Sequence, residues 1–219
     1  MKKIDNGREY RSMNLEAREL ENVEKSYAVE GYATTFEEPY HLYNFEDERG
    51  THEVREVVDI NAFEGADMSD VIFQFDHEGA VYARLSNGTM ELENDLHGLK
   101  VRAFLGGTAR GRELYEEING GYITKMSFGF TVADDNIERE ADGNYVRRIL
   151  KVGKLFDVSA VSYPQNNFTE ISARNHCDGV IAEIEAERLR AEEEARVEQE
   201  KRESLLARLN ALKGESNGN

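Results

Sequence analysis

The chain has 219 residues, of which 39% are hydrophobic and 32% are charged, and its formal net charge at pH 7 is -17. This length suits one globular domain of ordinary size with some residues to spare. The strongly negative charge argues against a nucleic-acid partner, because binding of phosphates needs clustered Lys and Arg. No apolar run approaches the roughly 20 residues that cross a bilayer, so no membrane partner is expected either.

The chain contains a single cysteine, Cys177. It therefore cannot form an internal disulfide framework or a metal site with several thiolate ligands. The N-terminal stretch MKKIDNGREY lacks the apolar run of a signal peptide. These features favour a reducing, intracellular setting, and no metal or other cofactor is predicted.

Regular structure is first predicted from residue 27 onwards. Residues 1–26 are polar and charged with little periodicity, whereas residues 27–36 are rich in β-branched and aromatic residues and predict a strand. Gly31 is a candidate β-bulge within this strand. Residues 44–50 are a polar loop in this interpretation, and residues 53–60 are a second strand.

A series of short strand patterns follows, and one helix comes after it. The strand patterns cover residues 71–75, 81–85, 89–93 and 99–105. Asn87-Gly88 predicts a hairpin between the second and third of them, because both positions readily take a positive φ. Residues 111–118 predict a short helix, which the Asn-Gly-Gly after it ends.

The strand around Ser127 is the first candidate for chemistry. At period two, large side chains share one face and mostly small or polar ones share the other. The first face holds Tyr122, Thr124, Met126, Phe128, Phe130 and Val132, and the second holds Ile123, Lys125, Ser127, Gly129 and Thr131. A hydroxyl on a rigid strand, with a glycine two residues away, suits a nucleophilic serine. An ordinary half-exposed strand has the same pattern, so other residues must decide.

Two further residues are candidates to act with such a serine. His77 follows the strand at 71–75, where its ring can be fixed as a general base requires; an ordinary histidine at a strand end is the alternative. Asp157 lies in the apolar stretch LFDVSAVSYP, where an unpaired carboxylate is costly. It either holds the ring of His77 and stabilises the imidazolium, or forms a salt bridge or a cap elsewhere. The remaining histidines, His41, His52, His97 and His176, lie in loop-like or polar contexts.

The last third of the chain changes in texture. Residues 134–144 are polar and turn-like, and residues 145–152 and 154–163 predict the last two strands. Residues 180–212 contain no Gly or Pro and are rich in Ala, Glu, Arg and Leu, which predicts one long helix. Its heptad positions are apolar at the ends and charged in the middle. It is therefore either a weak coiled-coil seam or a solvated single helix with pairs such as Glu192–Arg196.

Several blocks of the sequence resemble, in order, those of one known family. They are VEGYATTF, INAFEG, VIFQFDHEG, SNGTMEL, LHGLKV, GRELYEEINGGYITKMSFGF and LFDVSAVSYPQNNFTEISAR, and they cover residues 29–174. The chain resembles the prohead serine proteases of tailed bacteriophages, which are similar in fold to the herpesvirus assemblins. The resemblance implies a mainly β fold with helices (α+β), namely a compact antiparallel β-barrel of herpesvirus-protease-like type with a long C-terminal helix.

The resemblance also implies the residues of an active site. The catalytic positions of the blocks match three residues of this chain, His77, Ser127 and Asp157. Because the assemblins use a second histidine as the third member, His97 is the substitute for Asp157. Backbone N–H groups of Gln165 and Asn166 are the candidates for an oxyanion hole. The family usually has alanine where this chain has Gln165, which leaves the details of the substrate pocket open.

The implied function is that of a serine endopeptidase of Ser-His-Asp type inside the phage prohead, in the host cytoplasm. Its implied substrates are scaffold segments, the major capsid protein and the protease itself, and self-association is a further expectation. Three parts are predicted: a polar N-terminal segment (1–26), the protease domain (27–174) and a charged helical extension with a disordered tail (175–219). We expect the helix to attach the protease to scaffold or capsid subunits and to be a site of self-cleavage.

Two alternatives remain open at this point. The first is a non-catalytic capsid assembly or scaffolding protein that acts through its long helix. The second is a soluble β-barrel binding module with no viral connection. The joint presence of His77, Ser127 and Asp157 in their matching blocks argues against both.

Overall fold

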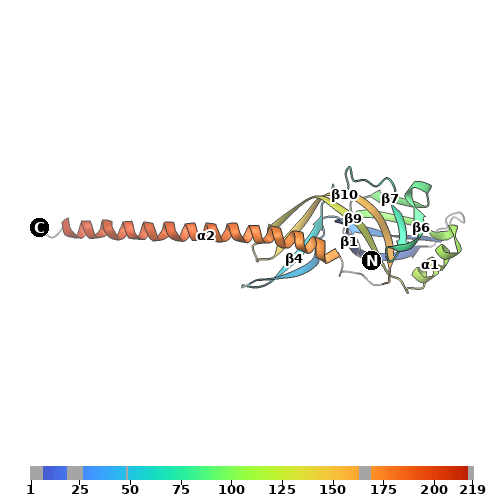
Figure 1. Ribbon diagram of the computed structural model, residues 1–219, viewed down its shortest axis with the longest axis horizontal. Coiled ribbons are helices and arrows are strands. Elements are labelled where there is room, and N and C mark those ends of the chain that lie inside the picture. Colours follow the sequence, from blue (N-terminus) through green and yellow to red (C-terminus); the bar gives the residue numbers. More distant parts are fainter. Residues whose placement is uncertain (1–6, 19–26, 48, 163–168, 217–219) are drawn as a thin grey trace. The chain divides into compact units, whose positions relative to one another are not determined.

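The computed structural model describes residues 7–18, 27–47, 49–162 and 169–216. The chain divides into two compact units, Met1–Cys177 and Asp178–Asn219. The first unit contains a large curled sheet and a short helix, and the second contains most of a long helix (Figure 1). Among the described residues, no helix is long and apolar enough to cross a membrane.

Ten strands, two α-helices and two short 3₁₀ helices make up the described elements. The strands are β1 (Glu9–Arg18), β2 (Ala28–Thr35), β3 (Tyr40–Asp47), β4 (Gly50–Val58), β5 (Ile72–Phe75), β6 (Glu78–Arg84), β7 (Met90–Asn94), β8 (Gly98–Phe104), β9 (Lys125–Arg139) and β10 (Tyr145–Val161). The α-helices are α1 (Ala109–Asn119) and α2 (Thr169–Ser216), and the short 3₁₀ helices are η2 (Leu85–Asn87) and η3 (Leu105–Gly107).

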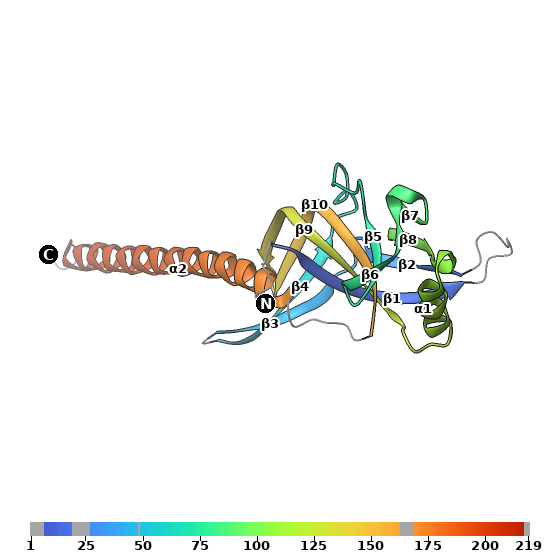
Figure 2. The same ribbon diagram turned by 45° about the vertical axis from the view of Figure 1, so that its right-hand side comes forward.

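The sheet follows the order β3-β4-β10-β9-β1-β2-β8-β7, and β5 and β6 branch from β10. Strand β10 pairs along one edge with β9, and along its other edge first with β4 and then with β5. Both β10–β4 and β10–β5 are parallel, whereas the other pairs are antiparallel. Figure 2 shows that the sheet is strongly curled rather than flat. The fold is thus mainly β, as expected, and its sheet is a mostly antiparallel, curled half-barrel rather than a closed barrel. The herpesvirus-protease-like type stays a prediction.

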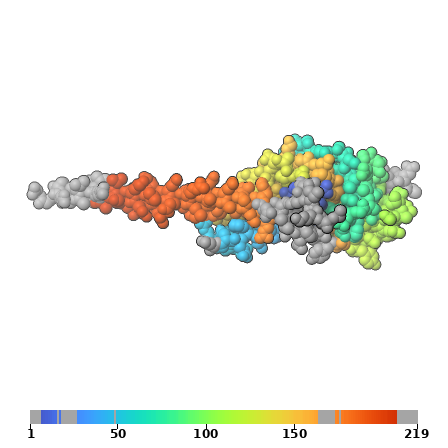
Figure 3. Space-filling model, viewed as in Figure 1, coloured from blue at the N-terminus to red at the C-terminus, as the bar shows by residue number. Residues whose placement is uncertain are grey.

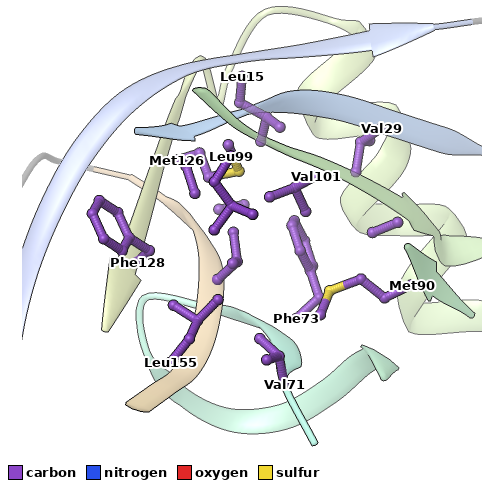
Figure 4. Close-up of a cluster of buried hydrophobic side chains, with 14 of the residues drawn as sticks. Leu15, Val29, Val71, Phe73, Met90, Leu99, Val101, Met126, Phe128 and Leu155 are labelled. Atoms are coloured by element: carbon purple, nitrogen blue, oxygen red, sulfur yellow. The ribbon is translucent and has the colours of Figure 1, made fainter. Parts of the chain in front are cut away.

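The hydrophobic core lies inside this curl and draws on strands that are far apart in the sequence (Figure 4). The labelled core residues are Leu15, Val29, Val71, Phe73, Met90, Leu99, Val101, Met126, Phe128 and Leu155. All ten are at most 5% exposed. Helix α1 adds Leu114, Tyr115 and Ile118 from one face, as three- and four-residue spacing requires. Burial of these apolar side chains is the main favourable term for the sheet.

Several predicted elements are confirmed and several are wrong. The strands expected at 27–36, 71–75 and 99–105 correspond to β2, β5 and β8, and the helix expected at 111–118 is α1. The hairpin expected at Asn87-Gly88 is wrong, because β7 pairs with β8 and β6 pairs with β5. Only Gly88 takes a positive φ there, and it follows the 3₁₀ helix η2.

Three other expectations underestimated the length of the strands. The polar loop expected at 44–50 is largely the end of β3 and the start of β4, which pair as a hairpin. The polar stretch after residue 134 continues β9 as far as Arg139. The two last strands are one strand, β10, interrupted by shifts in register between residues 149 and 157. The irregularity in β2 lies between Tyr32 and Thr34 rather than at Gly31.

Strand β1 falls in the segment in which no periodicity was recognised. It pairs with β9 on one side and with β2 on the other, so it lies in the middle of the sheet. Its residues Glu9 and Arg11 are buried although they are charged. An inward face of this kind does not follow the hydrophobic alternation by which strands are recognised.

Helix α2 begins earlier and ends later than predicted. In the second unit, every side chain from residue 191 to residue 207 is exposed (Figure 3). Arg188 pairs with Glu192, and Arg196 pairs with Glu193 at 2.7 Å, rather than in the predicted pair Glu192–Arg196. A coiled-coil seam would need a second helix, so both the solvated helix and the weak coiled-coil seam stay predictions. The attachment role of the helix stays a prediction.

Candidate active site

Ser127 lies on a small, polar face in the middle of the sheet. Strand β9 places it between Ser12 of β1 and Ser159 of β10. The next row along the strands is Tyr10, Gly129 and Asp157. The neighbours Phe128 and Phe130 point to the other side, where their rings stack in the core with centroids 4.7 Å apart. The two-faced character predicted for this strand is confirmed from Lys125 onwards.

The first residues of the predicted strand behave differently. Tyr122 is 84% exposed, whereas Ile123 is buried, which reverses the faces expected for them. The reason is that β9 begins only at Lys125. Tyr122 and Ile123 belong to the turn after α1, so the period of two does not apply to them.

His77 is held over this face by a tight turn between β5 and β6. Asp76 and His77 both have positive φ values, 49° and 58°, and Phe75 pairs with Glu78 across them. Two successive residues of this kind make a type I′ hairpin turn. Asp76 anchors the turn to β10, because its N–H donates to the carbonyl of Ala160 at 2.9 Å and its carboxylate accepts from the backbone N–H and the hydroxyl of Ser162.

The structure brings His77, Ser127 and Asp157 into one chain of hydrogen bonds. Nε2 of His77 lies 2.8 Å from Oγ of Ser127, and Nδ1 of His77 is hydrogen bonded to Oδ1 of Asp157. An ionised carboxylate only accepts, so Nδ1 carries the proton and Nε2 is left to accept the hydroxyl of Ser127. Ser159 donates to the same Oδ1 at 3.0 Å. Ser127 is 4% exposed and Asp157 is 2% exposed.

The other histidines and the predicted oxyanion-hole residues are not part of the hydrogen-bonded series Ser127–His77–Asp157. His97 lies in the turn between β7 and β8, where its ring packs against Tyr32 with centroids 4.5 Å apart. His41, His52 and His176 are each next to a different carboxylate, those of Glu53, Asp47 and Asp135. Gln165 and Asn166, the candidates for the oxyanion hole, lie outside the described residues.

Two residues that the sequence did not indicate also reach the site, Arg8 just before β1 and Tyr10 on β1. Tyr10 places its ring against that of His77, with centroids 4.4 Å apart and planes inclined at 66°. Arg8 lies with its NH1 3.6 Å from Oδ2 of Asp157. Gly129 leaves the room for this arrangement, because a Cβ there would lie 2.6 Å from Oδ2 of Asp157 and 2.8 Å from the ring of Tyr10. The small residue predicted beside Ser127 therefore has a definite steric role.

The opposite face of β1 enters a second group of polar residues, which we call the buried ion-pair cluster: Glu9, Arg11, Glu56 and Arg147. Arg11 donates to Glu56 at 2.5 and 2.8 Å, and Arg147 donates to Glu9 at 2.7 and 2.9 Å. Arg147 also donates to Glu56 at 3.0 Å, and Arg11 to Glu9 at 2.6 Å. Each carboxylate thus has two guanidinium partners, which is what makes burial of these charges tolerable.

The ionisation of the cluster follows from this pairing. Burial acts to raise the pKa of Glu56, but the charges of Arg11 and Arg147 outweigh it, and the pKa lies below its ordinary value. Nearby Cys177 is buried, and burial raises the pKa of its thiol to about 12. Cys177 is therefore a neutral thiol rather than a nucleophile at neutral pH. Among the residues that the structure describes, no group of three or more His, Cys, Asp or Glu is arranged to hold a metal ion.

The comparison with known families gives one result. A family model for the caudovirus prohead serine proteases matches residues 13–180. None of the curated proteins and none of the solved structures that were compared with the chain matches it. Since the family model covers most of the chain, and the resemblance noted in the sequence points the same way, the chain belongs to the caudovirus prohead serine proteases, which are hydrolases of bacteriophage capsid maturation.

Proposed function

We propose that this protein is a serine endopeptidase of Ser-His-Asp type that cleaves scaffold and capsid proteins, and itself, inside the assembling prohead in the host cytoplasm. The observation that carries the proposal is the hydrogen-bonded chain from Ser127 through His77 to Asp157 in a member of a serine protease family. Family membership supports a protease of capsid maturation. The triad and the substrates are our inference.

The proposed reaction is acyl transfer to Ser127. Its Oγ attacks the carbonyl carbon of the scissile peptide while Nε2 of His77 takes the hydroxyl proton. His77 then gives that proton to the leaving amine, and the C–N bond breaks to leave an acyl-enzyme. A water molecule next donates a proton to His77 and attacks the ester, which releases the acid and restores Ser127.

Asp157 acts in this scheme by fixing the imidazole. Because it accepts the Nδ1 proton, the ring presents its unprotonated Nε2 to Ser127. Burial of Asp157 strengthens its attraction for the imidazolium that forms during the reaction. The hydrogen bond that Ser159 donates keeps the carboxylate in one orientation. The oxyanion hole stays a prediction, with Gln165 and Asn166 as its candidates.

The test is co-expression of the protein with the neighbouring capsid gene, with the products read by intact mass. We expect shortened capsid or protease chains from the wild type. The Ser127→Ala variant should reduce cleavage by about a thousandfold or more while it stays folded, because loss of a triad member removes the nucleophilic pathway. Undiminished processing by a folded Ser127→Ala protein would refute the proposal.

The main alternative is a non-catalytic assembly protein that acts through α2. It predicts that particles form equally well with wild-type and Ser127→Ala protein, and that no chain is shortened in either case. Such a protein has no need of a serine hydroxyl hydrogen bonded to an oriented imidazole on a buried face. The geometry therefore favours the protease over this alternative.

A further inference from the structure

The two oxygens of the Asp157 carboxylate have different neighbours. Its Oδ1 accepts hydrogen bonds from His77 and from Ser159. Its Oδ2 faces Arg8, whose NH1 lies 3.6 Å away, too far for a good hydrogen bond but close enough for charge attraction. Arg8 is thus the nearby fixed cation, and it lies on the side of the carboxylate away from Ser159.

Arg8 is held in this place by an aromatic ring. The centre of its guanidinium lies 3.8 Å from the centroid of Phe156, a distance at which cation and ring attract each other. Phe156 lies at a shift in register of β10, because Leu155 and Asp157 oppose adjacent residues of β9. Such a β-bulge re-aims side chains beside a site. The bulge places the ring of Phe156 beside Asp157, so that Arg8 contacts both the ring and the carboxylate.

Tyr10 supports His77, the histidine that is hydrogen bonded to Asp157. Its ring meets the ring of His77 at an angle of 66°, the edge-on arrangement that aromatic pairs favour. Hydrogen bonds to Asp157 and Ser127 hold the two ring nitrogens of His77, and Tyr10 adds a contact with the ring itself. The contact with Tyr10 limits rotation of the imidazole away from Ser127.

Strand β1 is itself fixed by its opposite face. Glu9 and Arg11, which alternate with Arg8 and Tyr10, are locked in the buried ion-pair cluster. The matched part of the family model begins at residue 13 and so does not include Arg8 or Tyr10.

We propose that Arg8, which directly precedes β1, and Tyr10 on β1 are positioning residues of the active site, so that β1 and the residue before it complete the site. Arg8 attracts the carboxylate of Asp157 and keeps it oriented, and Tyr10 keeps the ring of His77 aligned with Ser127. The inference rests on the proposed Ser-His-Asp function. It follows that the site is formed only when β1 has joined the sheet, so that the N-terminal strand is a requirement for activity.

The proposal has a consequence for pH dependence. A cation beside Asp157 opposes the gain of a second positive charge on His77. Its removal should therefore move the acid limb of the pH–rate profile to higher pH. The charged and titratable groups around the pair, among the described residues, include Arg8 just before β1, Tyr10 on β1, Lys154 on β10, Asp76 in the turn of His77 and Glu78 at the start of β6. Of the two cations, Arg8 is the one in contact with Asp157.

The experiment measures the rate at which a fluorophosphonate probe labels the full-length protein between pH 5 and pH 9. In this reaction the serine Oγ–P bond forms, the P–F bond breaks, and the hydroxyl proton leaves through His77. We expect Arg8→Gln to label roughly fivefold to tenfold more slowly at neutral pH, with its acid limb about half a unit higher, since Arg8 is partly exposed and its charge is partly screened. Arg8→Lys should restore the position of the limb.

A matched control separates these effects from general damage. Arg148 lies on β10 and has an exposed side-chain fraction of 37%, close to the 35% of Arg8. It pairs with Glu37 at 2.8 Å. Arg148→Gln should label at the wild-type rate with an unchanged profile. Tyr10→Ala should lower the rate about tenfold, whereas Tyr10→Phe should stay within about twofold, because the contact is made by the ring.

Each result supports or overturns the proposal. An Arg8→Gln protein with the wild-type rate and profile would overturn it, and so would a slower rate that Arg148→Gln shares or that appears without any movement of the acid limb. Loss of activity in Tyr10→Phe equal to that in Tyr10→Ala would overturn the role of the ring. If the wild type itself is not labelled at Ser127, the proposed function fails first, and this inference fails with it.

Discussion

Two of the buried carboxylates of the sheet, Glu56 and Asp157, have opposite surroundings. Glu56, which is 0% exposed, accepts from Arg11 and Arg147 and from the hydroxyl of Tyr40 at 2.5 Å. Asp157 has a histidine and a serine as hydrogen-bond partners and one arginine at a longer distance. The negative charge of Glu56 is neutralised by fixed cations, whereas that of Asp157 remains for a group that can change its charge.

This difference suits Glu56 to a structural role and Asp157 to the role that we propose for it. A guanidinium stays protonated at any physiological pH, so a carboxylate between two of them has a constant partner. An imidazole gains and loses its proton near neutral pH, so a carboxylate beside it can stabilise a transient charge. Strand β1 serves both regions, because Arg11 and Tyr10 are neighbours on opposite faces.

The largest effect should come from Asp157→Asn. Asparagine keeps the size of the side chain but removes its charge, and its amide can donate to Nδ1 and so favour the wrong tautomer of His77. We expect labelling by a fluorophosphonate to fall by about a thousandfold or more. The control is Asp70→Asn, which removes a surface carboxylate paired with Arg84 and should change the rate less than about twofold. A wild-type rate in Asp157→Asn would show that Asp157 is not part of the machinery.

Glu56→Gln tests the other side of the comparison and should act on stability. It leaves Arg11 and Arg147 buried without one of their counter-charges, and breaking a buried pair in this way costs about 3–5 kcal/mol in the free energy of unfolding. Urea unfolding at pH 7 measures this loss. Glu37→Gln, which breaks an exposed pair with Arg148, is the control and should cost less than about 1 kcal/mol. Equal effects of the two variants would contradict the distinction.

The stability difference between wild type and Glu56→Gln should also depend on pH. The pKa of Glu56 is lower in the folded protein than its ordinary value of 4.5. The unfolded chain therefore binds a proton at a higher pH than the folded protein does. The contribution of the carboxylate is fully present above about pH 4.5 and is lost as the pH falls through the folded value. The difference in unfolding free energy should shrink on acidification, and a difference that grows would contradict the pairing.

The same contrast shows what the sequence can and cannot predict. Ser127, His77 and Asp157 each carry a local signal, namely a two-faced strand, a strand end and a carboxylate among apolar residues, and the family resemblance joined them. Strand β1 carries none, because its inward residues Glu9 and Arg11 are indistinguishable from a solvated surface until their partners are known. Those partners are distant in the sequence, with separations of 45 residues for Arg11–Glu56 and 138 for Glu9–Arg147.

Pairing between strands was the other limit. Asn87-Gly88 has the residues of a hairpin turn, yet the strands on its two sides do not pair with each other. Strand β6 pairs with β5, and β7 pairs with β8. A local pattern fixes which residues are extended, but the choice of partner depends on contacts made by the whole sheet. The same holds for Tyr10, which reaches the site through the register of β1 with β9, and for Arg8, which directly precedes β1.

Of the substitutions Asp157→Asn, Glu56→Gln and Gly129→Ala, we expect the last to have the smallest effect. It tests whether the lack of a side chain at Gly129 matters for the position of Asp157. The new methyl group would lie 2.6 Å from Oδ2 of Asp157 and 2.8 Å from Cε1 of Tyr10, so one or both must move. Movement of either loosens His77, and we expect the labelling rate to fall by about 10- to 100-fold. The free energy of unfolding should change by only about 1 kcal/mol.

The control for this variant is Gly107→Ala, because a Cβ at Gly107 meets no atom within 4 Å. It should leave both rate and stability close to those of the wild type. If Gly129→Ala lowers the rate while Glu56→Gln at a permissive temperature does not, the two faces of β1 are functionally separate, and the reactive carboxylate depends on local space rather than on the strength of the cluster. If Gly129→Ala is as active as Gly107→Ala, the positions of Asp157 and Tyr10 are not critical and the comparison fails at the active site.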